Sequence, residues 1–145
     1  MNRGKKPLLQ TMGREMTITT HGFDDIPEGP NVFVANHACM RDIFAIPASL
    51  PEDCDVVISS RLAYKNSSVY TAVRRLVIEN ALHTIPLEVH GGKEYLEVGL
   101  KMAKQALLDG RSLLIFPEGA YTGSAQVTKG RTGASRILFG ASIGG

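Results

Sequence analysis

Short, mostly apolar runs bounded by polar or turn-forming residues recur along this chain. Runs of this length, bounded by residues of these types, are typical of buried β-strands. Four of them occupy residues 32–35, 55–59, 83–87 and 113–116, and a weaker alternation over residues 16–20 predicts a further strand.

Helical spacing is clearest over residues 93–109. Positions four, three and four residues apart share one face of a helix, and here they are all apolar: Leu96, Leu100, Ala103 and Leu107. Gly110 supplies the signal that ends this helix. Shorter helices are predicted over residues 67–77 and over residues 42–49, where Pro47 must lie near an end or at a kink.

Strands and helices alternate along the chain, which is typical of an α/β domain with a mostly parallel sheet flanked by helices. We expect residues 1–145 to form a single domain of this class. In such sheets, functional sites lie beyond the carboxyl ends of the strands. Two polar clusters follow predicted strands here, Asn36-His37 and Pro117-Glu118-Gly119, and they are candidates for one shared crevice.

Composition narrows the classes of function. Of the 145 residues, 43% are hydrophobic and 21% are charged, and the net charge of +2 gives no indication of nucleic-acid binding. Cys39 and Cys54 are too few for a disulfide scaffold and predict reduced thiols in a cytoplasmic protein. No apolar stretch approaches the roughly 20 residues of a membrane span, so work on lipid is expected at a membrane surface.

His37 and Asp42 have the residue types of a general base and its orienting carboxylate. The imidazole takes a proton at one ring nitrogen, while the carboxylate holds the other N–H and stabilises the charged ring. Residues five apart on one continuous helix lie about 140° apart around its axis. We therefore expect His37 in the turn before a helix and Asp42 in its first turns. A helix-capping Asp and a core His are the structural alternative.

The second cluster is Phe116-Pro117-Glu118-Gly119. Proline ends the strand, glycine allows close backbone approach, and Glu118 is left at the mouth of the strand. Taken alone, this cluster favours a plain turn with a solvated glutamate.

Together, the two clusters resemble the glycerolipid (lysophospholipid) acyltransferase family, in which Asn-His-x4-Asp follows an apolar strand and Phe-Pro-Glu-Gly comes later in the chain. Residues 21–22 and 26–30 match the lead-in of the family, and Thr128-Lys129-Gly130 matches the segment that follows the second motif. The resemblance runs from Gly22 to Leu138. It implies an α/β fold of the glycerolipid acyltransferase type.

The resemblance also implies a reaction. His37, oriented by Asp42, would deprotonate the acceptor hydroxyl, which would attack the thioester of acyl-CoA or an acyl carrier protein directly. The acceptor would be a lysolipid-like compound, reached by peripheral contact with the inner face of a membrane. No cofactor or metal is implied, and no His/Cys/Asp cluster has metal-ligand spacing. The implied substrate-binding residues are Glu118, Gly119, Lys129, Gly130 and Arg131.

Two arginines of the family pattern are missing. Residues 86–90 contain none after the matching strand, and residues 120–121 are Ala-Tyr where the family often has one. In the family both help to hold the phosphate of the acceptor, and losing a charge-assisted contact of this kind typically costs about 1.5–3 kcal/mol. Either Lys129, Arg131 or Arg61 substitutes, or the acceptor carries a different head group.

The family pattern continues beyond the segment that matches residues 137–139, so we expect the C-terminal part of the domain to be missing. A non-catalytic lipid- or acyl-carrier-binding module that kept the fold is the alternative to an enzyme. The presence of His37, Asp42 and Glu118 favours the enzyme.

Three further features have simpler explanations. Residues 140–144 match the G-x-S-x-G pattern of hydrolases, but the acid and the His that this motif needs downstream of Ser142 do not follow. A nucleophilic Cys39 would need its side chain beside that of His37, and a spacing of two points them apart. His83 has no acidic residue at a useful spacing and is expected to be structural or solvent-facing.

Overall fold

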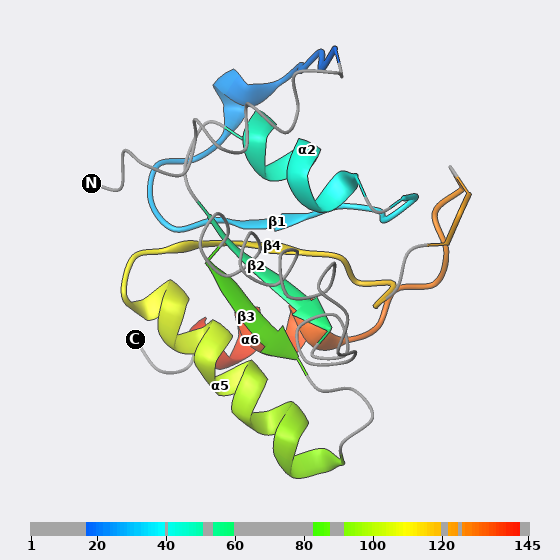
Figure 1. The fold of residues 1–145 in the computed structure, drawn as a ribbon. Helices are drawn as coiled ribbons and strands as arrows, with labels where there is room; N and C mark the ends of the chain where they lie inside the picture. The colour runs from blue at the N-terminus through cyan, green and yellow to red at the C-terminus, as the bar shows by residue number, and fades with distance from the viewer. Residues whose placement is uncertain are drawn as a thin grey trace, which may run out of the picture.

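A computed structural model describes residues 17–39, 41–50, 54–59, 83–87, 92–119, 122–124 and 126–142. Within these residues, four parallel strands form one sheet between helices (Figure 1). In the order β1-β4-β2-β3, the strands are β1 (Val32–Val34), β4 (Ser112–Ile115), β2 (Cys54–Ser59) and β3 (Thr84–Leu87). The helices are η1 (Phe23–Asp25), α2 (Asp42–Ser49), α5 (Lys93–Leu108) and α6 (Gly133–Ser142). The predicted α/β class with a parallel sheet is confirmed.

Helix α2 covers one face of the sheet, and α5 and α6 cover the other (Figure 1). Alternate residues of the central strands contribute to the two layers, because side chains alternate across a strand. Val56 and Leu114 pack with Ile43 of α2, whereas Val57 and Leu113 pack with the α5 and α6 layer. A central strand buried on both faces is mostly apolar, which explains the short apolar runs of the sequence.

Helix α5 packs closely against the edge strand β3. A Cβ atom on Gly99 would lie 2.6 Å from the carbonyl oxygen of Pro86 and 2.9 Å from Cδ1 of Leu87, so glycine is needed for this approach. The helix ends at Leu108, and Gly110 adopts a left-handed φ of 78° just beyond it. The helix predicted over residues 93–109 and its glycine stop are therefore confirmed.

A buried carboxylate connects three strands at their amino ends. Asp55, which is 3% exposed, accepts a hydrogen bond from Nη1 of Arg111, and Nδ1 of His83 lies 3.4 Å from its Oδ1. Nη2 of Arg111 also lies 3.6 Å from Oδ2 of Asp109. The acidic partner of His83 thus comes from the neighbouring strand, which sequence spacing did not indicate.

The structure differs from the sequence prediction at two described segments. Residues 17–20 are exposed irregular chain and not a strand, because β-propensity needs a paired neighbour to become a strand. Helix α6 was not predicted, since Ile137 is its one fully buried large side chain and two of its residues, Gly133 and Gly140, are glycines. The helix predicted over residues 67–77 lies outside the described residues. No described helix is long and apolar enough to cross a bilayer.

Candidate active site

The loops that follow β1 and β4 meet at the carboxyl end of the sheet (Figure 1). Ala35 N–H donates to the carbonyl oxygen of Ile115 over 3.1 Å. Beyond the strands, Thr122 N–H donates to the carbonyl oxygen of His37 over 2.9 Å, and Gly123 N–H donates to that of Ala38 over 3.0 Å. The two sequence clusters, which were expected to share one crevice, therefore lie side by side.

His37 lies in the loop before α2, and Asp42 is the first residue of that helix. Nδ1 of His37 lies 3.1 Å from Oδ2 of Asp42, within hydrogen-bond distance. The imidazole also stacks on the ring of Phe116, with ring centroids 4.5 Å apart and an angle of 30° between the planes. His37 is 6% exposed. Its ring is held by the carboxylate of Asp42 at one edge and by the ring of Phe116 on one face.

Cys39 holds the carboxylate of Asp42 at both oxygens. Its N–H donates to Oδ2 over 2.7 Å, and its thiol donates to Oδ1 over 3.3 Å. Burial raises the pKa of Asp42, but the hydrogen bonds from Cys39 and His37 outweigh burial and bring the pKa below 3.8. Asp42 is therefore ionised at neutral pH, and the Cys39 thiol is a donor to it rather than a partner of the imidazole.

Glu118 accepts a backbone hydrogen bond at each carboxylate oxygen. Oε2 accepts from the N–H of His37 over 3.0 Å, and Oε1 accepts from the N–H of Thr128 over 2.9 Å. The bond from Thr128, followed by that from His37, lowers the pKa of Glu118 below 4.5. Glu118 is only half-buried, so its carboxylate still meets solvent, but the turn is not a plain one because two backbone amides bind this carboxylate.

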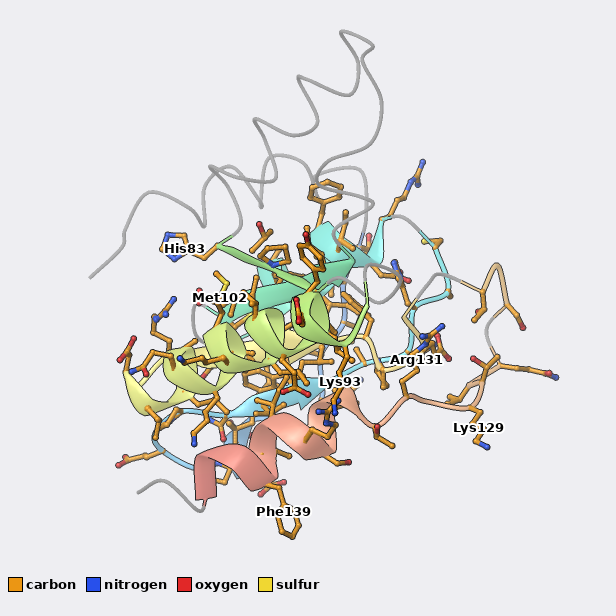
Figure 2. The ribbon with its side chains drawn as sticks, turned by 90° about the horizontal axis from the view of Figure 1, so that it is seen from below. His83, Lys93, Met102, Lys129, Arg131 and Phe139 are labelled. Atoms are coloured by element: carbon orange, nitrogen blue, oxygen red, sulfur yellow. The ribbon has the colours of Figure 1, made fainter. Side chains whose placement is uncertain are left out.

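Two glycines allow the segment around residue 130 to lie against the end of β4. A Cβ atom on Gly130 would lie 3.1 Å from Cβ of Pro117, and one on Gly119 would lie 3.1 Å from Nε of Arg131. Gly119 also has a left-handed φ of 75°. The Arg131 side chain therefore lies over Gly119, while exposed Lys129 lies at the outer edge of the loop (Figure 2).

Several contacts of this site were not predicted from the sequence, three of which come from residues outside the predicted pair of His37 and Asp42. They are the stacking of Phe116 on the imidazole, the thiol bond from Cys39 to Asp42, and the bond from the Thr128 amide to Glu118. The place of Phe116 in the motif, directly before Pro117, was the one feature of the sequence that could have indicated its contact with the site.

The described residues contain neither a metal site nor a hydrolase nucleophile elbow. Among the described residues, no group of three metal-ligating side chains comes together. Gly140 to Ser142 lies within helix α6, so the G-x-S-x-G match lacks the strand-to-helix turn of a nucleophile elbow.

Comparisons with known proteins agree with this architecture. The model of the family described as Acyltransferase matches residues 17–143. The fold is similar to the crystal structure of the 1-acyl-sn-glycerophosphate (LPA) acyltransferase PlsC from Thermotoga maritima, with a TM-score of 0.63 and 16% sequence identity. That match covers 94% of this chain and 53% of the PlsC chain, so this chain spans about half the length of that protein. Curated protein sequences contain no significant match.

Proposed function

Because this chain belongs to the acyltransferase family, we propose that it transfers a fatty acyl group from a thioester to a hydroxyl group of a lysophospholipid-like acceptor. The donor is acyl-CoA or an acyl carrier protein. The observation that carries the proposal is the 3.1 Å contact between Nδ1 of His37 and Oδ2 of ionised Asp42, at the carboxyl end of a parallel sheet.

In the proposed mechanism, His37 is the general base. Asp42 accepts the hydrogen on Nδ1, which leaves the basic lone pair on Nε2. Nε2 takes the proton of the acceptor hydroxyl as the hydroxyl oxygen attacks the thioester carbonyl carbon. The tetrahedral intermediate then collapses, the carbon–sulfur bond breaks, and the leaving thiolate takes the proton from the imidazolium. Asp42 stabilises the imidazolium between these two steps.

The acceptor is proposed to lie against the loops that carry Glu118, Gly119, Lys129, Gly130 and Arg131. Lys129 and Arg131 are exposed cations, suited to an anionic head group. The family arginine after Phe-Pro-Glu-Gly is missing, but the Arg131 side chain lies 3.1 to 3.7 Å from the Cβ position of Gly119, beside that motif. Arg131 is therefore the best supported substitute. Arg61, the other substitute suggested by the sequence, lies outside the described residues.

Peripheral contact with a membrane, at its inner face in the cytoplasm, is part of the proposal. Val127 is 79% exposed and lies two residues from Lys129, so one loop presents an apolar side chain and a cation to a lipid surface. Vesicles containing anionic lipid should retain the protein on flotation more than vesicles of neutral lipid do. Protein that stays in solution with both vesicle types would contradict membrane contact.

The experiment that tests the reaction measures thiol release from acyl-CoA, and from an acylated carrier protein, with a panel of lysolipids. We expect release that depends on the acceptor and is lost in His37→Ala. His21→Ala is the matched control, because His21 is exposed and lies outside the site. Acceptor binding without release, equal in the wild type and in His37→Ala, would instead indicate a binding module.

A further inference from the structure

Glu118 connects two segments that lie far apart in the sequence. Its Oε2 accepts from the backbone N–H of His37, and its Oε1 accepts from the backbone N–H of Thr128. His37 belongs to the loop after β1, whereas Thr128 belongs to the basic loop, which we define as residues 126–131. One carboxylate therefore bridges the proposed base and the loop that carries the proposed head-group cations, Lys129 among them.

Backbone contacts fix the segment from which this carboxylate extends. Arg131 N–H donates to the carbonyl oxygen of Pro117 over 2.7 Å, and Gly119 N–H donates to that of Phe116 over 3.1 Å. The Cβ position of Gly130 is 3.1 Å from the Pro117 side chain, which leaves little room for a shift. What the Glu118 carboxylate adds is a direct connection from this fixed point to both loops.

We propose that Glu118 is a positioning residue, whose carboxylate fixes the backbone of His37 relative to the basic loop. The inference rests on the proposed acyl transfer and deepens it. If one side chain holds both loops, the loop that binds the head group and the loop that carries the base keep one separation. The acceptor held by Lys129 and Arg131 would then meet the imidazole at a set distance.

This connection needs a carboxylate rather than any polar side chain of the same length. Both partners are N–H donors, and a carboxylate presents an acceptor oxygen to each of them. The amide of Gln presents one oxygen and one NH₂ group. In Glu118→Gln, one of the two backbone amides would therefore face another donor, and the loops would separate at that contact.

The direct test follows the two backbone amides by NMR in the full chain, labelled with ¹⁵N, as the pH is lowered. We expect the amide resonances of His37 and Thr128 to shift together with one midpoint below 4.5, and this shared titration to vanish in Glu118→Gln. Glu94→Gln, in the exposed first turn of α5, is the matched control and should preserve it. Separate midpoints in the wild type, or a shared titration that persists in Glu118→Gln, would overturn the proposal.

A kinetic test separates positioning from direct binding of the acceptor. We expect kcat of Glu118→Gln to fall by about 10- to 100-fold, because a displacement of about 1 Å can cost on the order of 10²-fold. The KM for the acceptor should change little. A higher KM at unchanged kcat would mean that Glu118 binds the acceptor directly, and would overturn the positioning role. Absence of turnover in the wild type would overturn the proposed acyl transfer, while the NMR titration would still decide the connection made by Glu118.

Discussion

Cys39 holds both carboxylate oxygens of Asp42, with its N–H 2.7 Å from Oδ2 and its thiol 3.3 Å from Oδ1. The same Oδ2 lies 3.1 Å from the imidazole of His37. Cys39, which lies between His37 and Asp42 in the sequence, thus sets the direction in which the carboxylate points.

This contact leads to a first expectation at Cys39. Cys39→Ala removes the bond to Oδ1, and a net hydrogen bond of about 0.5–1.5 kcal/mol corresponds to a loss of roughly 2- to 10-fold in kcat. Cys39→Ser keeps a donor at the same position and should retain most of the activity. Steady-state kinetics at saturating donor and acceptor measure both variants. If Cys39→Ser instead loses activity as completely as His37→Ala does, the result would support the alternative in which the Cys39 thiol is a nucleophile.

Replacing Asp42, the carboxylate proposed to orient His37, should have a larger effect. In Asp42→Asn, the side-chain amide donates to the ring where a carboxylate accepted, which favours the wrong tautomer of His37 and leaves the imidazolium without a counter-charge. A loss on the order of 10⁴-fold in kcat is expected for a base of this type, with the circular dichroism spectrum unchanged. Asp24→Asn, at an exposed position in η1, serves as the control. Comparable turnover in the two variants would argue against an orienting role for Asp42.

The protein should become less stable in acid because of two carboxylates, those of Asp42 and Glu118. The pKa values of Asp42 and Glu118 lie below their ordinary values of 3.8 and 4.5 in the folded chain. The unfolded chain therefore binds more protons in this range, so the free energy of unfolding decreases as the pH falls below about 4.5. Urea unfolding at a series of pH values measures the slope. The free energy of unfolding should change less steeply with pH in the double variant Asp42→Asn/Glu118→Gln. An equal slope in the variant and the wild type would contradict the assignment of this pH dependence to the two carboxylates.

Gly99 should not tolerate a methyl group. A Cβ atom there would lie 2.6 Å from the backbone oxygen of Pro86, and relieving such a contact typically costs about 1–3 kcal/mol. Gly99→Ala should therefore lower the melting temperature. Gly133→Ala, in the first turn of α6 with no atom within 4 Å of its Cβ position, is the matched control and should be neutral or stabilising. Equal melting temperatures of the two variants would exclude close packing of α5 on β3.

The charged cluster at the amino ends of the strands should matter for stability and not for turnover. Arg111→Gln removes the charge beside buried Asp55 and should cost about 1–3 kcal/mol of unfolding free energy. Arg136→Gln breaks an exposed pair with Glu97 and should cost about 0–1 kcal/mol. Arg111→Gln should keep the wild-type kcat, because His83, which shares Asp55 with Arg111, lies at the end of the sheet opposite Lys129 and Arg131 (Figure 2). A loss of kcat in Arg111→Gln without loss of stability would contradict a purely structural role for this cluster.

The sequence predicted the strands and α5 because both depend on regular burial. The sheet strands are short apolar runs, and Leu100, Ala103 and Leu107 line one face of α5. Helix α6 was not predicted because a single large side chain, Ile137, packs it against the core, and one buried position makes no repeating apolar pattern. The order β1-β4-β2-β3 was also beyond reach, since apolar runs identify strands and not their neighbours.

The site was predicted as residue types and not as a set of contacts. The spacing predicted His37 in the turn before a helix and Asp42 in its first turns, and the structure has this placement. The partners of Glu118 are two backbone amides, one of them in a distant loop. Backbone amides are present at almost every residue, so no side-chain pattern could have indicated which two would bind it.

The strand order has a consequence for how the chain folds. Among the described strands, β4 comes last in the chain but lies between β1 and β2. While a ribosome is still making residues 112–115, β1 lacks the neighbour with which it pairs. The sheet must therefore close through contacts between distant parts of the sequence, a topology that folds slowly. Since Phe116, Glu118 and Thr122 hold the loop of His37, the site around this proposed base is assembled only after that late strand has been inserted.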